Sequence, residues 1–255
     1  MPEGDTIHYA ANRIRPVLAG HVPEELRTPH PRFGRARWET RLAGRTVEAV
    51  EAHGKHLFLR FEGGLTIHSH LRMTGSWRVL DGARAPSHSA WLVIRRDDRQ
   101  VVQFKGPVLE LMTDSRTRFD GRLAALGPDV LAPALDEAGF LRRLREDDQS
   151  RGIGDALLDQ RNLAGVGNVW KSEACHAVGI DPWRPLARVS DAEALAAVRA
   201  VRPRMLESVE AGGHPHGLAV YGRAGETCPR CGGRIRARGQ GDDNRTTYWC
   251  PACQG

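Results

Sequence analysis

Residues 157–174 read LLDQRNLAGVGNVWKSEA, a glycine-rich turn with a helical pattern on each side of it. A tight turn between two helices exposes the first backbone amides of the second helix, and such amides bind anions. We therefore expect Asn168, and Lys171 one helical turn further on, to contact a phosphate there. The segment lacks the GxGxxG spacing and the preceding strand of a dinucleotide-binding loop. A helical corner with a purely structural use is the alternative.

The sequence before this turn predicts a helix followed by strands. Residues 4–19 carry apolar side chains at helical spacing, namely Ile7, Ala11, Ile14 and Leu18. Pro16 lies inside the pattern and predicts a kink or an early end. From about residue 46 to residue 112, short apolar runs alternate with turns, as in GKHLFLRF at 54–61. This half predicts a β-sandwich or barrel preceded by one helix.

The sequence after residue 133 is helical and ends in a cysteine-rich segment. Helical patterns cover about residues 134–146, 155–161, 169–179 and 191–211. We expect an α+β protein of four parts: a helix and β-sandwich lobe (1–115), a linker (116–132), a helical lobe (133–222) and a hairpin (223–255).

Four cysteines near the C-terminus form two CxxC pairs, Cys228 with Cys231 and Cys250 with Cys253. Four thiolates at this spacing predict one tetrahedral zinc ion, which is structural because no coordination position stays open. Metal binding supplies the folding free energy that so short a segment lacks. The intervening basic residues suit a phosphate backbone, namely Arg234, Arg236, Arg238 and Arg245. A zinc ribbon that serves only stability or protein contacts is the alternative. Cys175, in a helical pattern, is expected to be a buried apolar residue.

Composition and charge narrow the class of protein. The 255 residues are 40% hydrophobic and 27% charged, as in globular domains. No stretch reaches the roughly 20 apolar residues of a membrane span, and MPEGDTIHYA does not resemble a secretory signal, so a cytoplasmic location is expected. A net charge of +6 favours polyanionic partners such as nucleic acid, although an ordinary basic enzyme fits the charge equally well.

Six segments in order along the chain resemble the formamidopyrimidine-DNA glycosylase/endonuclease VIII family. They are MPEG (1–4), HGKHLF (53–58), SHLRMTG (69–75), LGPDVL (126–131), LLDQRNLAGVGNVWKSEA (157–174) and the cysteine hairpin ending in NRTTYWCPACQ (244–254). The resemblance implies a β-sandwich lobe, a helix–two-turn–helix lobe and a zinc hairpin that hold damaged double-stranded DNA. It also implies a monomeric base-excision-repair enzyme associated with the bacterial nucleoid.

Within the family, the PEGDT opening is similar to the endonuclease VIII branch of the actinobacterial type. The guanine-lesion branch carries an Arg-Arg-Phe-Gly wedge, whereas this chain reads GPVLELM at 106–112. The remaining wedge is Arg72 with Met73, which would fill the space left by an extruded nucleotide. This departure favours oxidised pyrimidines as substrates, and a purine-lesion glycosylase acting on 8-oxoguanine or formamidopyrimidine is the alternative. A buried gap-filling role is the alternative for Met73.

The resemblance also implies the catalytic residues. Removal of Met1 exposes the secondary amine of Pro2, and an α-amino group with a pKa of about 7.7–8.0 is partly neutral at working pH. The amine would attack C1′ as a nucleophile, giving a Schiff base that undergoes β,δ-elimination. Glu3 would transfer protons beside it, Lys55 would contact phosphate and assist elimination, and Arg245 would clamp the phosphates that flank the lesion.

Each of these residues also has an ordinary interpretation. Pro2 would simply precede a helix, Glu3 would be a capping carboxylate, and Lys55 would be a solvated lysine. Two other classes of protein share parts of the pattern. One is a non-catalytic module that binds DNA lesions, and the other is a zinc-ribbon protein of transcription or translation.

Overall fold

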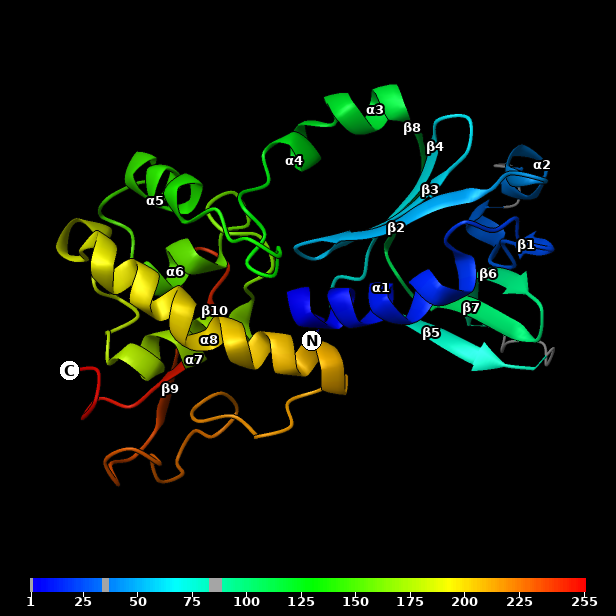
Figure 1. Cartoon of the computed structure of the whole chain (residues 1–255). Coiled ribbons are helices and arrows are strands. Elements are labelled where there is room, and N and C mark those ends of the chain that lie inside the picture. The colour runs from blue at the N-terminus through cyan, green and yellow to red at the C-terminus, as the bar shows by residue number, and fades with distance from the viewer. Residues whose placement is uncertain (1, 34–36, 83–88) are drawn as a thin grey trace. The chain divides into compact units, whose positions relative to one another are not determined.

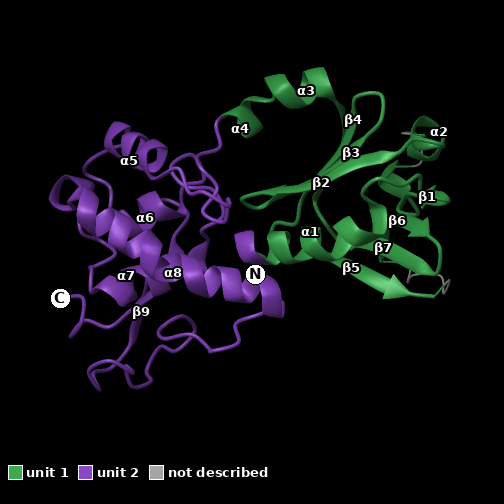
Figure 2. Ribbon diagram, in the orientation of Figure 1, with its two compact units in different colours: residues 1–2, 6–124 green, residues 3–5, 125–255 purple. Residues whose placement is uncertain are grey.

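A computed structural model describes residues 2–33, 37–82 and 89–255 of the chain (Figure 1). The chain divides into two compact units, residues 1–2 with 6–124 and residues 3–5 with 125–255 (Figure 2). Each unit has its own apolar core. Among the described residues, every helix is too short or too polar to cross a lipid bilayer.

The first element is helix α1, Gly4–Leu18. The apolar stripe expected from the sequence is buried, with Ile7, Ile14 and Leu18 each at most 1% exposed. The early end predicted at Pro16 is wrong, because the helix continues through Pro16 to Leu18. A proline so near the end removes one amide from the last turn only, and burial of Val17 and Leu18 holds that turn in place.

Eight strands of the first unit form two antiparallel four-stranded sheets. One has the order β2-β3-β4-β8, and its strands are Val47–His53, His56–Phe61, Leu65–His70 and Val108–Thr113. The other has the order β1-β6-β7-β5, and its strands are Glu25–Arg27, Ala90–Arg96, Arg99–Phe104 and Ser76–Asp81. Two separate sheets around a common core make this a sandwich rather than a barrel.

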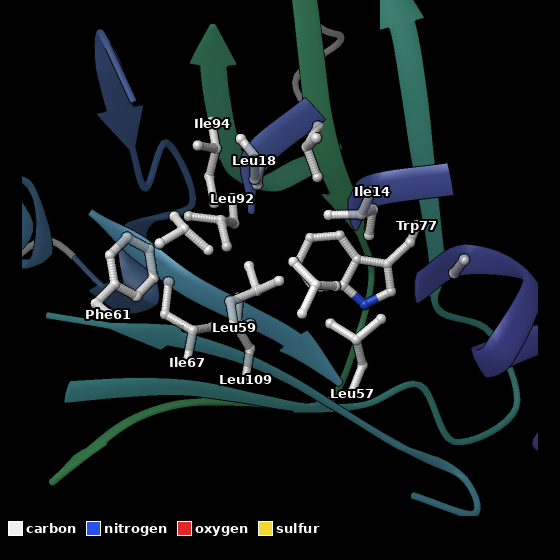
Figure 3. Close-up of a cluster of buried hydrophobic side chains, with 14 of the residues drawn as sticks. Ile14, Leu18, Leu57, Leu59, Phe61, Ile67, Trp77, Leu92, Ile94 and Leu109 are labelled. Atoms are coloured by element: carbon white, nitrogen blue, oxygen red, sulfur yellow. The ribbon is translucent and has the colours of Figure 1, made fainter. Parts of the chain in front are cut away.

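The alternation of side chains along β3 decides which face of its sheet is buried. Leu57, Leu59 and Phe61 point into a cluster that also receives Trp77 and Leu92 from the other sheet (Figure 3). The residues between them in β3 lie on the opposite face, as the sequence predicts. That face carries His56, which becomes important at the site.

Several short elements of the first unit are not evident in the sequence. They are β1, the 3-10 turn Pro31–Phe33, and helices α2 (Trp38–Leu42), α3 (Asp114–Phe119) and α4 (Gly121–Ala124). Helices α3 and α4 lie at the start of the segment expected to be a linker. Both helices are too short to show a helical period. Helix α3 begins at a local cap, in which the Thr113 hydroxyl accepts a hydrogen bond from the Arg116 amide at 3.2 Å.

The second unit is helical. Its elements are α5 (Glu137–Glu146), α6 (Ile153–Leu158), α7 (Asn168–Val178), the 3-10 turn Leu186–Arg188 and α8 (Asp191–Ala211). Helix α8 has the bounds expected from the sequence because a capping box starts it, in which Ser190 and Glu193 exchange hydrogen bonds, and Gly212 ends it. The unit closes with the hairpin β9 (Arg236–Gln240) and β10 (Arg245–Trp249).

Candidate active site and zinc centre

The four hairpin cysteines converge on one point, as their spacing predicts. All four sulfur atoms lie within 4.8 Å of one another, with Cys228 Sγ 3.8 Å from Cys253 Sγ and Cys231 Sγ 3.5 Å from Cys250 Sγ. Tetrahedral zinc with Zn–S bonds of about 2.3 Å requires sulfur atoms about 3.8 Å apart. The donor set therefore fits one structural Zn²⁺. Cys175 is not part of it; it is buried in the helical core, where burial raises the pKa of its thiol to about 12.

The zinc hairpin is joined to the end of helix α7. His176 of this helix places Nε2 3.3 Å from Cys228 Sγ, and Arg230 donates to the Ala177 carbonyl at 2.6 Å. The Gln254 side chain donates to the Ile180 carbonyl at 2.9 Å, just after the helix. The position of the hairpin in this unit therefore depends on α7.

Glu3 caps the N-terminus of α7. Its carboxylate is 2% exposed and accepts hydrogen bonds from the amides of Gly167 at 3.0 Å, Val169 at 2.8 Å and Trp170 at 3.3 Å. A carboxylate at this end of a helix is stabilised both by the amides and by the helix dipole. The anion expected at the AGVGN turn is thus supplied by the protein itself, and these amides are not open to a DNA phosphate.

Two glycines of the turn explain why Glu3 can reach the helix. A Cβ at Gly167 would lie 2.2 Å from Glu3 Cδ, and a Cβ at Gly4 would lie 2.8 Å from Gly165 Cα. The Gly4 amide also donates to the Gly165 carbonyl at 2.9 Å. Residues 3–5 are therefore fixed against the turn, and Pro2 is attached to this fixed segment. Met1, whose removal is expected to free the Pro2 amine, lies outside the described residues.

Asn168 and Lys171 lie inside the second unit rather than on its surface. Asn168 is 5% exposed and donates to the Thr246 carbonyl at 2.7 Å, which connects α7 to β10. Lys171 is fully buried, its Nζ donates to Gln240 Oε1 at 3.2 Å, and burial lowers its pKa to about 8. This geometry does not fit the phosphate contact expected of Lys171, because the ammonium faces the hairpin and not solvent.

Arg245 is the first residue of β10 and follows the turn of the zinc hairpin. Asn244 before it adopts a left-handed conformation with φ of 48°. The Arg245 side chain is 39% exposed and forms an ion pair at 3.3 Å only with the solvent-exposed Asp243 among the described residues. Such a weakly paired guanidinium can exchange its partner for a phosphate.

In the first unit, Lys55 lies in the turn between β2 and β3, and Arg72 and Met73 lie in the turn after β4. Arg72 has a left-handed φ of 53°, and its amide donates to His70 Nδ1 at 3.1 Å. Met73 is 64% exposed, which is the opposite of a core gap-filler. An exposed apolar side chain beside an arginine is what a wedge requires.

Between these two turns lies a row of histidines, which the sequence pattern alone does not identify as a unit. His56 Nδ1 is 2.8 Å from His68 Nε2, and His68 Nδ1 is 3.4 Å from Glu110 Oε2. Glu110 accepts from Arg122 at 3.0 Å. The spacing HSH at 68–70 signals two side chains on one sheet face, but pairing them with His56 requires the strand register, which places His56 opposite His70.

The histidine row is held in its neutral form. Burial lowers the pKa of His56 to about 2, helped by the positive charge that His70, His68, His53 and Arg122 would place beside it. Burial likewise lowers the pKa of His70 to about 4, together with the nearby Arg72 and Lys55. Lys55 and Arg72 are therefore near enough to His70 to affect its charge. The row connects the two turns that carry the expected basic residues of this unit.

Comparisons with known proteins cover the whole chain. The formamidopyrimidine-DNA glycosylase N-terminal domain model matches residues 1–110, the H2TH domain model of the same enzyme matches residues 126–218, and the zinc finger found in this glycosylase and in isoleucyl-tRNA synthetase matches residues 225–255. Lactococcus lactis formamidopyrimidine-DNA glycosylase, solved in complex with DNA containing N7-benzyl-Fapy-dG, has the same fold, with a TM-score of 0.84 over 99% of each chain at 23% identity.

Curated relatives extend over the full length as well. "Probable endonuclease 8 2" of Streptomyces coelicolor is 43% identical over all of this chain and 94% of its own length. "DNA-(apurinic or apyrimidinic site) lyase Nei2" of Mycolicibacterium smegmatis is 37% identical over all of this chain and 99% of its own length. The chain belongs to the formamidopyrimidine-DNA glycosylase/endonuclease VIII family, within its endonuclease VIII branch.

Proposed function

We propose that this protein is a bifunctional DNA glycosylase and abasic-site lyase of base excision repair. The observation that carries the proposal is the fixed position of Glu3, whose carboxylate is bound by three amides at the start of α7. This anchorage immobilises the residue next to Pro2, as a terminal nucleophile requires. Relatives named endonuclease 8 and DNA lyase over the whole chain support the same activity.

The chemistry begins at the nitrogen of Pro2 after Met1 is removed. The neutral amine attacks C1′ of the damaged nucleotide, the bond from C1′ to the base breaks, and the base leaves with a proton. The bond from C1′ to the ring oxygen O4′ then breaks, with Glu3 proposed to pass a proton to O4′, and the opened sugar is joined to the protein as an iminium ion. The positive nitrogen of this ion accepts the electrons released when a proton leaves C2′. The 3′ phosphate then departs by β-elimination, the 5′ phosphate departs by δ-elimination, and water releases the protein.

The remaining site residues divide into those that face solvent and those that do not. Lys55 and Arg245 are partly exposed and suit contacts with phosphates next to the lesion. Arg72 and Met73 suit the wedge that replaces the extruded nucleotide. For Asn168 and Lys171 we propose an indirect role, because their hydrogen bonds hold β10 and β9 against α7 and so position Arg245.

We propose oxidised pyrimidines in double-stranded DNA as the preferred substrate. The support is the exposed Met73 wedge together with the absence of an Arg-Arg-Phe-Gly segment from the sequence. Excision of oxidised purines is the second candidate, because a Thermus thermophilus formamidopyrimidine-DNA glycosylase is 33% identical over all of this chain. We further propose a monomer at the bacterial nucleoid, divided at residues 1–115, 116–132, 133–222 and 223–255.

Borohydride trapping tests the proposal. The protein is incubated with duplex oligonucleotides that carry thymine glycol, 8-oxoguanine or an abasic site, and borohydride is added. Reduction of the imine should leave a covalent protein–DNA adduct on the abasic duplex and more adduct on thymine glycol than on 8-oxoguanine. In a protein acetylated at the Pro2 nitrogen, the lone pair is delocalised into the amide and cannot attack, so this protein should give no adduct.

Each outcome has a distinct meaning. An absence of adduct with every duplex, despite tight binding to them, would identify a non-catalytic module that binds lesions. An adduct that persists after acetylation would place the nucleophile on a lysine instead of Pro2. More adduct with 8-oxoguanine than with thymine glycol would reverse the proposed substrate preference.

A further inference from the structure

The zinc hairpin carries an open groove at the end away from its turn. Arg234, Arg236, Arg238 and Trp249 line this groove. Arg236 lies across from Trp249 in the β-ladder, whereas Arg245 lies across from Gln240 at the turn. Four residues of strand separate the two ends, which is about 13 Å. The groove is therefore distinct from the site in which Arg245 is proposed to clamp phosphates.

The three arginines of the groove form a row of uncompensated charge. All three are exposed, and none forms an ion pair with a carboxylate in the part of the chain that the structure describes. By contrast, the neighbouring Arg223 pairs with Glu226 at 2.9 Å. Alternate residues along an extended segment are about 6.7 Å apart and point to one side. Positive groups at this repeat suit successive phosphates of an extended polynucleotide strand.

An aromatic platform lies at one end of the row. The guanidinium carbon of Arg238 is 4.0 Å from the centre of the Trp183 ring and 5.7 Å from that of Trp249. The two indoles meet edge to face, with ring centres 4.7 Å apart. The Arg238 guanidinium lies over Trp183 and the residue is exposed, so we infer that the side of the guanidinium turned away from Trp183 is open. An open guanidinium plane is a stacking surface for a base.

The platform is rigid because the loop that carries Trp183 is fixed. The Trp183 amide donates to Asp181 Oδ1 at 3.0 Å, and the Pro182 carbonyl accepts from Gln240 Nε2 at 2.7 Å. Gln240 is itself buried and also accepts from Thr247. The stack is thus bound to the same strand that carries the arginines, and it needs no rearrangement to receive a ligand.

We propose that this groove binds single-stranded DNA, with a base stacked on Arg238 over Trp183 and the adjoining phosphates on Arg236 and Arg234. Bases in a duplex are stacked on one another, so only an unpaired base can use the platform. The inference rests on the proposed function only for its choice of DNA as the polymer. It requires neither Pro2 nor a lesion. The enzyme would thereby hold unpaired strand beside the duplex that it repairs.

The test measures binding of the zinc-loaded full chain to a fluorescein-labelled twelve-nucleotide thymidine oligomer by anisotropy, at several salt concentrations. We expect Arg238→Ala to weaken binding about tenfold, within the range of one lost base stack. Arg238→Lys keeps the charge and loses the plane, so it should weaken binding with little change in salt dependence. Arg236→Ala should lower the slope of log Kd against log salt by about 0.7, the value for one phosphate contact on a single strand.

Two controls show whether a loss of binding comes from this groove, from a general loss of positive charge or from a loss of folding. Arg142→Ala removes an exposed arginine of α5 in the same unit and should bind the oligomer as the unchanged protein does. Zinc content and melting temperature show whether each variant is folded. Trapping on the abasic duplex is measured in parallel, so a protein that lacks lyase activity but binds the oligomer contradicts only the proposed function.

Three results would overturn the proposal. One is Arg238→Ala binding with unchanged affinity, and another is Arg238→Lys binding as well as the unchanged protein. The third is undamaged duplex competing as effectively as single strand per nucleotide, which would make the groove a duplex contact. Loss of oligomer binding in Arg238→Ala with trapping retained would support it.

Discussion

At the scale of single residues, the site depends on a buried carboxylate more than on exposed charge. Glu3 lies among three amides, and its charge-assisted hydrogen bonds are stronger than those of a neutral group in the same place. The cap therefore couples the first residues of the chain to α7. A change that alters the charge of Glu3 but keeps its shape isolates this contribution.

Glu3→Gln provides that change. The amide nitrogen of glutamine cannot accept a hydrogen bond, so one face of the cap becomes a donor that opposes the amides of α7. We expect the free energy of unfolding to fall by roughly 2 kcal/mol, in the range for charged hydrogen bonds, and adduct formation to fall at least a hundredfold. Urea denaturation and borohydride trapping measure the two effects. Glu146→Gln, at the exposed end of α5, is the control and should change neither.

The histidine row makes a prediction about pH. His56 and His70 have pKa values lowered to about 2 and about 4, whereas the unfolded chain titrates near 6.5. Below pH 6.5 these histidines take up protons in the unfolded state but not in the folded state. Their contribution to the free energy of unfolding is therefore fully present above this pH and is lost as pH falls toward 4. At pH 5 each histidine contributes at most about 2 kcal/mol of this loss.

Urea denaturation at pH 7.5 and pH 5.0 tests the assignment. We expect the difference between the two pH values to shrink in His56→Gln with His70→Gln, because glutamine does not titrate. Replacement of the exposed His21 by glutamine is the control and should leave the difference unchanged. An equal loss of stability in the double variant would assign the acid sensitivity to the carboxylates instead.

At the scale of elements, the sequence predicts those whose pattern repeats and misses those defined by contacts. The bounds expected for helix α8, about 191–211, agree with the structure, in which caps mark both of its ends. Strand β1 could not be predicted, since its three residues form a strand by pairing with β6, which is distant in the sequence. The early end predicted for α1 at Pro16 was wrong because burial of the last turn outweighs one lost hydrogen bond.

The AGVGN turn makes a prediction for this scale, because its glycines admit Glu3. In Gly167→Ala the new Cβ would lie 2.2 Å from Glu3 Cδ, and both groups are buried, so the carboxylate must leave its cap. We expect a loss of about 3 kcal/mol in the free energy of unfolding and a loss of trapping. Gly213→Ala is the control, since a Cβ there meets no atom within 4 Å. Equal melting temperatures for the two variants would contradict this account.

At the scale of the whole molecule, the sequence predicted the family, the two kinds of lobe and the zinc ligands, because each has a local pattern. It could not predict which charged residues are buried. Lys171 stands beside a turn expected to bind phosphate, yet its ammonium is buried against Gln240 of the hairpin, 69 residues further along the chain. The histidine row was equally hidden, since its members meet only through the register of β3 and β4.

Zinc should therefore control more of the second unit than its own loop. The ion stabilises the hairpin, and Gln240 belongs to this hairpin. Gln240 Oε1 accepts a hydrogen bond from the buried ammonium of Lys171. When zinc is removed and the hairpin loosens, Lys171 loses this partner and gains water, so we expect the melting temperature to fall by several degrees. Limited proteolysis should cut first within residues 223–255.

Cys228→Ser should reproduce the effect of a chelator, whereas Cys175→Ala, which changes a buried thiol outside the metal site, should retain full zinc content. Proteolysis that begins in the β-sandwich of either zinc-free sample would show that the ion does not act through this contact.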